Sequence, residues 1–140
     1  MTCSEFLSSI KSRGANIAPM AAPNKISMAN ALLQQNNCAM LPEFMQQLYS
    51  QTGGINLGSG YIFGPDDTSY SSRYSAPSIA KINQDTPIHG KTIFGRNDLF
   101  WFAFDIFGTC YMLDNLTLKP LRKYDDPFKA LTDCLIAGMI

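Results

Sequence analysis

Residues 99–105 form the strongest predicted strand of this chain, and they constrain its fold more than any other segment. They read Leu-Phe-Trp-Phe-Ala-Phe-Asp. Successive side chains of a strand point to opposite faces, so the three phenylalanines share one face, and Leu99, Trp101 and Ala103 share the other. Apolar residues on both faces predict one of two arrangements: a central strand covered on both sides, or a strand with one face that exposes an apolar patch.

The residues around this strand have the pattern of an antiparallel meander. Residues 92–94 are expected to form a strand that Gly95 ends, and residues 110–113 are expected to return antiparallel to residues 99–105. A further strand is predicted over residues 118–122. Pro120 marks it as an edge strand, because proline has no N–H to donate to a neighbouring strand.

A helix is predicted from Pro42 to about Gly53. Pro42 suits the first helical position, and Glu43 in the first turn complements the positive end of the helix dipole. Gly53 or Gly54 is expected to end the helix in a left-handed conformation. Apolar residues four apart give it one apolar face that can pack on a sheet. These pairs are Phe44 with Leu48 and Met45 with Tyr49.

Three further helices have recognisable starts. Thr2 or Ser4 is expected to cap the first, Asn24 a second that runs to about residue 35, and Asp125 or Asp126 a C-terminal helix. Residues 78–84 fit either a helix or a strand. The chain is 140 residues long, which suits a single domain over 1–140. The order predicts an α+β fold: N-terminal helices packed on an antiparallel β-sheet (a meander), with a C-terminal helix.

Charge and cysteine content exclude several classes of protein. Eleven basic and eleven acidic residues cancel, so the chain has no broad electrostatic attraction for nucleic acid or for anionic membranes. The four cysteines are scattered, without the close pairs of a zinc site. Residues 1–13 lack the pattern of a secretory signal. We therefore expect a reduced, cytoplasmic protein with no metal and no cofactor.

Four passages resemble the SUKH superfamily of the Smi/Knr type in their order and spacing. They are Leu41-Pro42 opening a helix before Gly53-Gly54, then Tyr61-Ile62-Phe63-Gly64, then Phe104-Asp105 followed by Gly108 and Tyr111, and finally Pro120 before a helix with Phe128. The resemblance implies a SUKH-like, non-catalytic protein-binding domain. In bacteria such proteins commonly act as immunity proteins that neutralise polymorphic toxins, often nucleases, by stoichiometric binding. In other settings they act as regulatory scaffolds.

The predicted protein-binding residues lie mainly in residues 66–74 of the polar loop over 66–78, with the corner at residues 63–65 beside them. Its tyrosines, serines and arginine resemble an antibody paratope, where rigid rings combine with adaptable hydrogen bonds. The alternative is a solvated loop whose tyrosines pack back on the sheet. Trp101 is either a core residue or the centre of an exposed aromatic patch. The candidate residues are Asp66, Asp67, Tyr70, Arg73, Tyr74 and Trp101.

Other chemistry has weaker support in the sequence. A small cysteine-dependent enzyme would use Cys38 or Cys110 as nucleophile, with His89, the single histidine, as base. Residues 90–92 read Gly-Lys-Thr but lack the glycine of a phosphate-binding loop five residues earlier. A nucleic-acid site would need a local cluster of cations such as Arg73, Lys91 and Arg96. The partner expected first is a cognate toxin domain, with the protein a monomer or a homodimer, no membrane and no direct nucleic-acid binding.

Overall fold

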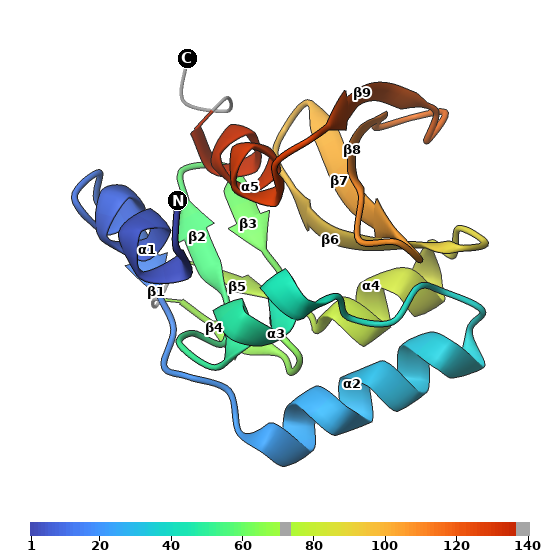
Figure 1. Ribbon diagram of the computed structural model, residues 1–140, viewed down its shortest axis with the longest axis horizontal. Coiled ribbons are helices and arrows are strands. Elements are labelled where there is room, and N and C mark those ends of the chain that lie inside the picture. The colour runs from blue at the N-terminus through green and yellow to red at the C-terminus, as the bar shows by residue number, and fades with distance from the viewer. Residues whose placement is uncertain (71–73, 137–140) are drawn as a thin grey trace.

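The computed structural model describes residues 1–70 and 74–136, and within them it contains five helices and nine strands (Figure 1). This confirms the predicted α+β class. In chain order the elements are α1 (Cys3–Lys11), β1 (Asn16–Ile17), α2 (Pro23–Gln35), α3 (Glu43–Tyr49), β2 (Ile55–Leu57), β3 (Gly60–Ile62), β4 (Thr68–Ser69), β5 (Ser75–Ala76), α4 (Ile79–Asp85), β6 (Lys91–Arg96), β7 (Phe100–Asp105), β8 (Cys110–Asp114), β9 (Pro120–Tyr124) and α5 (Pro127–Ile136).

Seven of the described strands form one antiparallel sheet in the order β1-β2-β3-β6-β7-β8-β9. The sheet is the predicted meander, interrupted between β3 and β6 by the small β4–β5 hairpin and by α4. β9 lies at one edge and begins at Pro120, as its missing N–H predicts. The two-residue β1 lies at the other edge. A bulge interrupts the pairing of β8 with β9.

The helix starts follow local signals, with shifts of one to two residues. Thr2 caps α1 in a reciprocal pair of hydrogen bonds with Glu5. The prediction that Asn24 caps α2 is wrong: Ala22 is the cap, and Pro23 occupies the first helical position, which its fixed φ favours. Pro42 is likewise the cap of α3, one residue before the position predicted for it.

α3 ends at Tyr49, well before the glycines that were expected to end it. The following segment is drawn to another part of the chain by hydrogen bonds. The Thr52 hydroxyl donates to the carbonyl oxygen of Ala18 at 2.6 Å, and the Gly53 N–H donates to that of Pro19 at 2.6 Å. These tertiary bonds take the backbone out of the helical path before a glycine cap is reached.

The undecided segment 78–84 is helical. Ser78 caps α4 by accepting a hydrogen bond from the N–H of Lys81. The buried Asn83 side chain pairs with the backbone of β6 as a neighbouring strand would. Its oxygen accepts a hydrogen bond from the N–H of Ile93 at 2.7 Å, and its amide donates one to the Ile93 carbonyl oxygen at 2.9 Å. α4 therefore satisfies backbone hydrogen-bonding groups of β6 at Ile93, where β3 is not paired with it.

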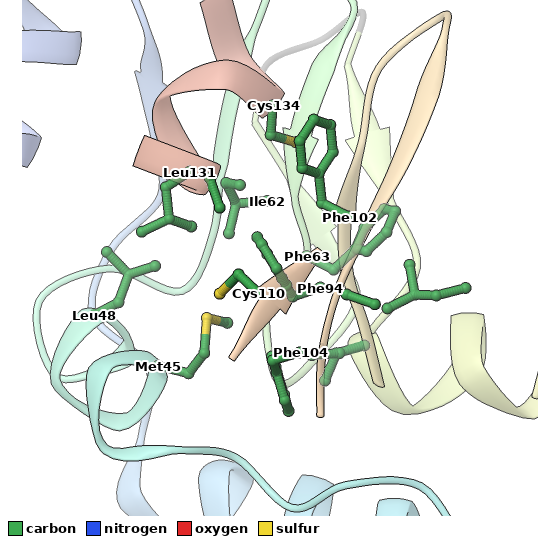
Figure 2. Close-up of a cluster of buried hydrophobic side chains, with 14 of the residues drawn as sticks. Met45, Leu48, Ile62, Phe63, Phe94, Phe102, Phe104, Cys110, Leu131 and Cys134 are labelled. Atoms are coloured by element: carbon green, nitrogen blue, oxygen red, sulfur yellow. The ribbon is translucent and has the colours of Figure 1, made fainter. Parts of the chain in front are cut away.

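The hydrophobic core lies between α5, α3 and the sheet. Figure 2 shows Met45 and Leu48 of α3 pointing toward Leu131 of α5 and Cys110 of β8. Phe102 and Phe104 of β7 are fully buried on the same side, whereas Trp101 is half-buried and Leu99 is exposed. One face of residues 99–105 is thus core, and the other includes a partly open Trp. α2 packs on α4, which in turn packs on β6.

α5 rests directly on the backbone of two strands, at glycines. A Cβ atom at Gly95 would lie 2.8 Å from the Cys134 sulfur and 2.7 Å from the Tyr61 carbonyl oxygen. One at Gly60 would lie 2.6 Å from the carbonyl oxygen of Cys134. The prediction that Gly95 ends its strand is therefore wrong. β6 continues through it after a bulge, and the missing side chain makes room for the helix.

Truncation of the core phenylalanine of β7 tests the assignment of its faces. Phe102→Ala is expected to lower the free energy of unfolding by about 3–5 kcal/mol, because it removes a fully buried ring. The measurement is urea denaturation. The control Leu116→Ala, at an exposed turn, is expected to change stability by less than about 0.5 kcal/mol. A cost below about 1 kcal/mol for Phe102→Ala would contradict this core.

Gly95→Ala tests the close approach of α5. Where the native backbone conformation suits alanine, replacing glycine by alanine usually stabilises a protein, because it lowers the conformational entropy of the unfolded chain. Here we expect a loss of about 1–3 kcal/mol in unfolding free energy, because the added methyl overlaps its neighbours. In a double-mutant cycle, Gly95→Ala is expected to cost less in a Cys134→Ala background than in the wild type, because the contact with the sulfur is gone. A Gly95→Ala variant that is more stable than the wild type in denaturant titrations would refute the arrangement.

Candidate protein-binding site

A groove of about 500 Å³ opens where three turns of the main sheet meet. The turns are those between β2 and β3, between β6 and β7, and between β8 and β9. We call it the Tyr74–Trp101 groove. Its lining residues are Gly58, Ser59, Tyr61, Tyr74, Arg96, Asn97, Asp98, Trp101 and Asn115.

Three side chains from adjacent strands form the centre of this groove. Tyr61, Arg96 and Trp101 are aligned across β3, β6 and β7, so they share one face of the sheet. The Arg96 guanidinium lies 5.6 Å from the centre of the Trp101 ring, a cation–π distance. Arg96 is exposed and makes no ion pair within residues 1–70 and 74–136. Its charge is therefore available to a partner.

Asn97 fixes the turn that forms one wall of the groove. Its side-chain oxygen accepts hydrogen bonds from the N–H groups of Leu99 and Phe100, both at 2.9 Å. Its amide donates to the carbonyl oxygen of Cys134 in α5 at 3.2 Å. The buried Asn97 thus connects the β6–β7 turn to the helix that fills the core. Asp98, exposed beside it, brings a carboxylate to the same wall.

The two described tyrosines of the predicted loop have different environments. The Tyr70 hydroxyl donates to the carbonyl oxygen of Ile62 at 3.0 Å, and its ring lies 5.7 Å from that of Tyr61. Burial raises the pKa of Tyr70. Tyr70 therefore packs back on the sheet and supports Tyr61, which is the alternative that the sequence left open for the tyrosines of this loop. Tyr74 is 40% exposed and lines the groove.

The predicted acidic pair lies away from the groove and has structural bonds. The Asp66 carboxylate is 3.3 Å from the Lys25 ammonium of α2. Asp67 accepts a hydrogen bond from the N–H of Ser78 at 2.8 Å, where α4 begins. Arg73 lies outside the described residues. Of the six predicted binding residues, the structure brings Tyr74 and Trp101 together in one place.

Two central residues of the groove, Tyr61 and Arg96, are not among the binding residues predicted from the sequence. Tyr61 belongs there only to one passage of the family resemblance, and Arg96 only to a possible nucleic-acid site. Their position follows from strand register, since Tyr61 pairs with Arg96 and Arg96 with Trp101. A pattern along one strand does not contain that information, because the register is set across strands.

The thiols lack the features of catalytic nucleophiles. All four cysteines are buried. Burial raises the pKa of Cys110 to about 12, and it raises that of Cys38 despite a hydrogen bond with the Ile88 backbone. A nucleophilic thiol has the opposite shift. His89 is exposed in the turn before β6. The described part of the chain contains no group of three or more His, Cys, Asp or Glu side chains placed to hold a metal ion.

Comparison of the chain with protein-family models, with curated proteins and with solved structures finds no match in any of the three. Among the described helices, none has the length and apolar character needed to cross a bilayer.

Thiol titration tests the cysteine-dependent alternative. At pH 8, well below the raised pKa of Cys110, we expect the native thiols to react slowly with Ellman's reagent and to react quickly only after unfolding. Leu116→Cys provides a matched control, because it places a thiol at a highly exposed position. A native wild-type thiol that reacts as fast as this control would revive the enzyme hypothesis.

Proposed function

We propose that this protein is a cytoplasmic, non-catalytic protein-binding domain of the SUKH type that acts as an immunity protein. It neutralises a cognate toxin domain by binding it in a one-to-one complex that covers the toxin's active site or substrate groove. The Tyr74–Trp101 groove is the part of the surface that makes this contact. The proposal combines the sequence resemblance with the composition and geometry of the groove.

The observation that carries the proposal is the grouping of Trp101, Arg96 and Tyr74. Tryptophan, tyrosine and arginine are the residue types that dominate the energetic centres of protein interfaces. Here the Trp ring is held by its strand and by the guanidinium above it, and the groove wall is fixed by Asn97. Such a preformed site loses little conformational entropy on binding.

The neutral charge of the chain bears on the kind of partner. The groove contains one cation and one anion, Arg96 and Asp98, so it is suited to a polypeptide surface with both charges and apolar groups. A nucleic-acid site would show a one-sided excess of Lys and Arg along its surface. Protein binding therefore fits the charges that line this groove better.

The first experiment is co-purification with the product of a neighbouring toxin gene, followed by calorimetry on the isolated complex. We expect the double variant Tyr74→Ala/Arg96→Ala to keep its thermal stability, since both side chains are exposed. It is expected to bind the toxin at least about 2 kcal/mol more weakly, or roughly 30-fold. Met28→Ala, at an exposed apolar position of α2 away from the groove, serves as the control and is expected to bind normally.

Two results would contradict the proposal at different levels. Unchanged affinity in the double variant would remove the groove from the interface while leaving the toxin as partner. Failure to bind or neutralise any neighbouring toxin would remove the immunity role, and a general regulatory scaffold would then be the better hypothesis.

A further inference from the structure

Each of the three turns that border the Tyr74–Trp101 groove is held by the side chain of one asparagine or aspartate. The turns follow β2, β6 and β8, and the residues that hold them are Asn56, Asn97 and Asp114. Such side chains fix a turn because their oxygen or amide group reaches backbone groups a few residues away. The shape of the groove therefore depends on three local side chains as well as on the pairing of the strands.

Asn56 holds the β2–β3 turn from inside the protein. It is buried, and its amide donates to the carbonyl oxygens of Gly58 and Gly60, both at 3.1 Å. Its side-chain oxygen accepts from the amide of Asn16 in β1 at 2.9 Å. Gly58 lines the groove and has a left-handed φ of 57°. This wall of the groove is thus attached to a buried side chain.

Asn97 holds the β6–β7 turn and also connects it, through α5, to β3. Its amide donates to the carbonyl oxygen of Cys134 at 3.2 Å, and the Cys134 thiol donates to the carbonyl oxygen of Tyr61 at 3.4 Å. Cys134 lies in the last turn of α5, where carbonyl groups lack partners within a helix. One residue of α5 therefore sets the spacing between two walls of the groove.

Asp114 holds the β8–β9 turn, whose residue Asn115 lines the groove. One carboxylate oxygen of Asp114 accepts from the N–H groups of Leu116 and Thr117, both at 2.8 Å. The same turn contains Leu118 with a φ of 60°, a conformation that leucine adopts at an energetic cost. Such a conformation persists only where the surrounding structure determines it. The bonds to Asp114 are part of that structure.

We propose that Asn56, Asn97 and Asp114 are positioning residues for partner binding, because they hold the groove walls in one shape before a partner arrives. This inference rests on the proposed function and adds how the site gains affinity. The side-chain oxygen and amide of Asn56 and Asn97 are all bonded within the chain, and Asp114 does not line the groove. Their contribution is therefore a lower entropic cost of ordering the site, and not a contact with the partner.

Trp101 is the single tryptophan of the chain, so its fluorescence reports on the groove without any partner. We expect acrylamide to quench it more strongly in Asp114→Ala than in the wild type, because a loosened wall exposes the ring. Asp114→Asn keeps an acceptor oxygen and is expected to restore wild-type quenching. Asp105→Ala is the matched control. Its carboxylate holds the β7–β8 turn by accepting from the N–H groups of Phe107 and Thr109, but that turn does not line the groove.

The same variants are then compared by calorimetry in the toxin complex. Asp114→Ala is expected to bind roughly three- to thirtyfold more weakly than the wild type, whereas Asp105→Ala is expected to bind normally. Asn97→Asp keeps the acceptor for the β6–β7 turn but loses the bond to the Cys134 carbonyl oxygen, and its affinity is expected to fall in the same range. Because Asn97 is buried, circular dichroism first checks that this variant folds, and the aspartate pair decides if it does not.

The outcomes separate this inference from the proposed toxin binding. Equal quenching in Asp114→Ala and the wild type overturns it, as does an equal increase in Asp105→Ala, which would show a general loss of stability. Unchanged toxin affinity in Asp114→Ala also overturns it while toxin binding itself stands. If no neighbouring toxin binds, the proposed function fails, and the quenching comparison still decides whether these residues hold the groove.

Discussion

The contact between α5 and the bare backbone of β3 and β6 is the constraint on which the rest of the structure depends. Glycines at positions 60 and 95 let the helix approach closer than any side chain would permit. That approach brings the Cys134 carbonyl within reach of Asn97, which in turn shapes the β6–β7 turn. The geometry of the Tyr74–Trp101 groove is therefore linked to the packing of the core through two glycines and one buried amide.

Local signals in the sequence were sufficient for the class of fold but not for its tertiary details. The capping residue Thr2, the edge position of Pro120 and the apolar pattern of residues 99–105 each report on their immediate neighbours, and each prediction was confirmed. The sequence predicts Gly53 or Gly54 as a left-handed helix end and Gly95 as the end of a strand. Their true surroundings are set by distant segments, the 18–19 link for one and α5 for the other.

The candidate site was predictable in composition and unpredictable in arrangement. A loop rich in tyrosine suggested binding, but the sequence does not tell that Tyr70 packs against Tyr61 whereas Tyr74 faces solvent. Arg96 joins Trp101 only through strand register. Composition identifies the kinds of residue available, and tertiary packing decides which of them reach the surface.

The two edges of the main sheet have a consequence for the behaviour of this protein in solution. Open strand edges offer free backbone groups that template the addition of further strands and lead to aggregation. Here one edge is only two residues long, and the other carries Pro120, exposed Lys123 and a bulge. Growth by strand pairing is discouraged at both ends. A partner of this chain must therefore be recognised mainly through side chains, and not through strand addition at a sheet edge.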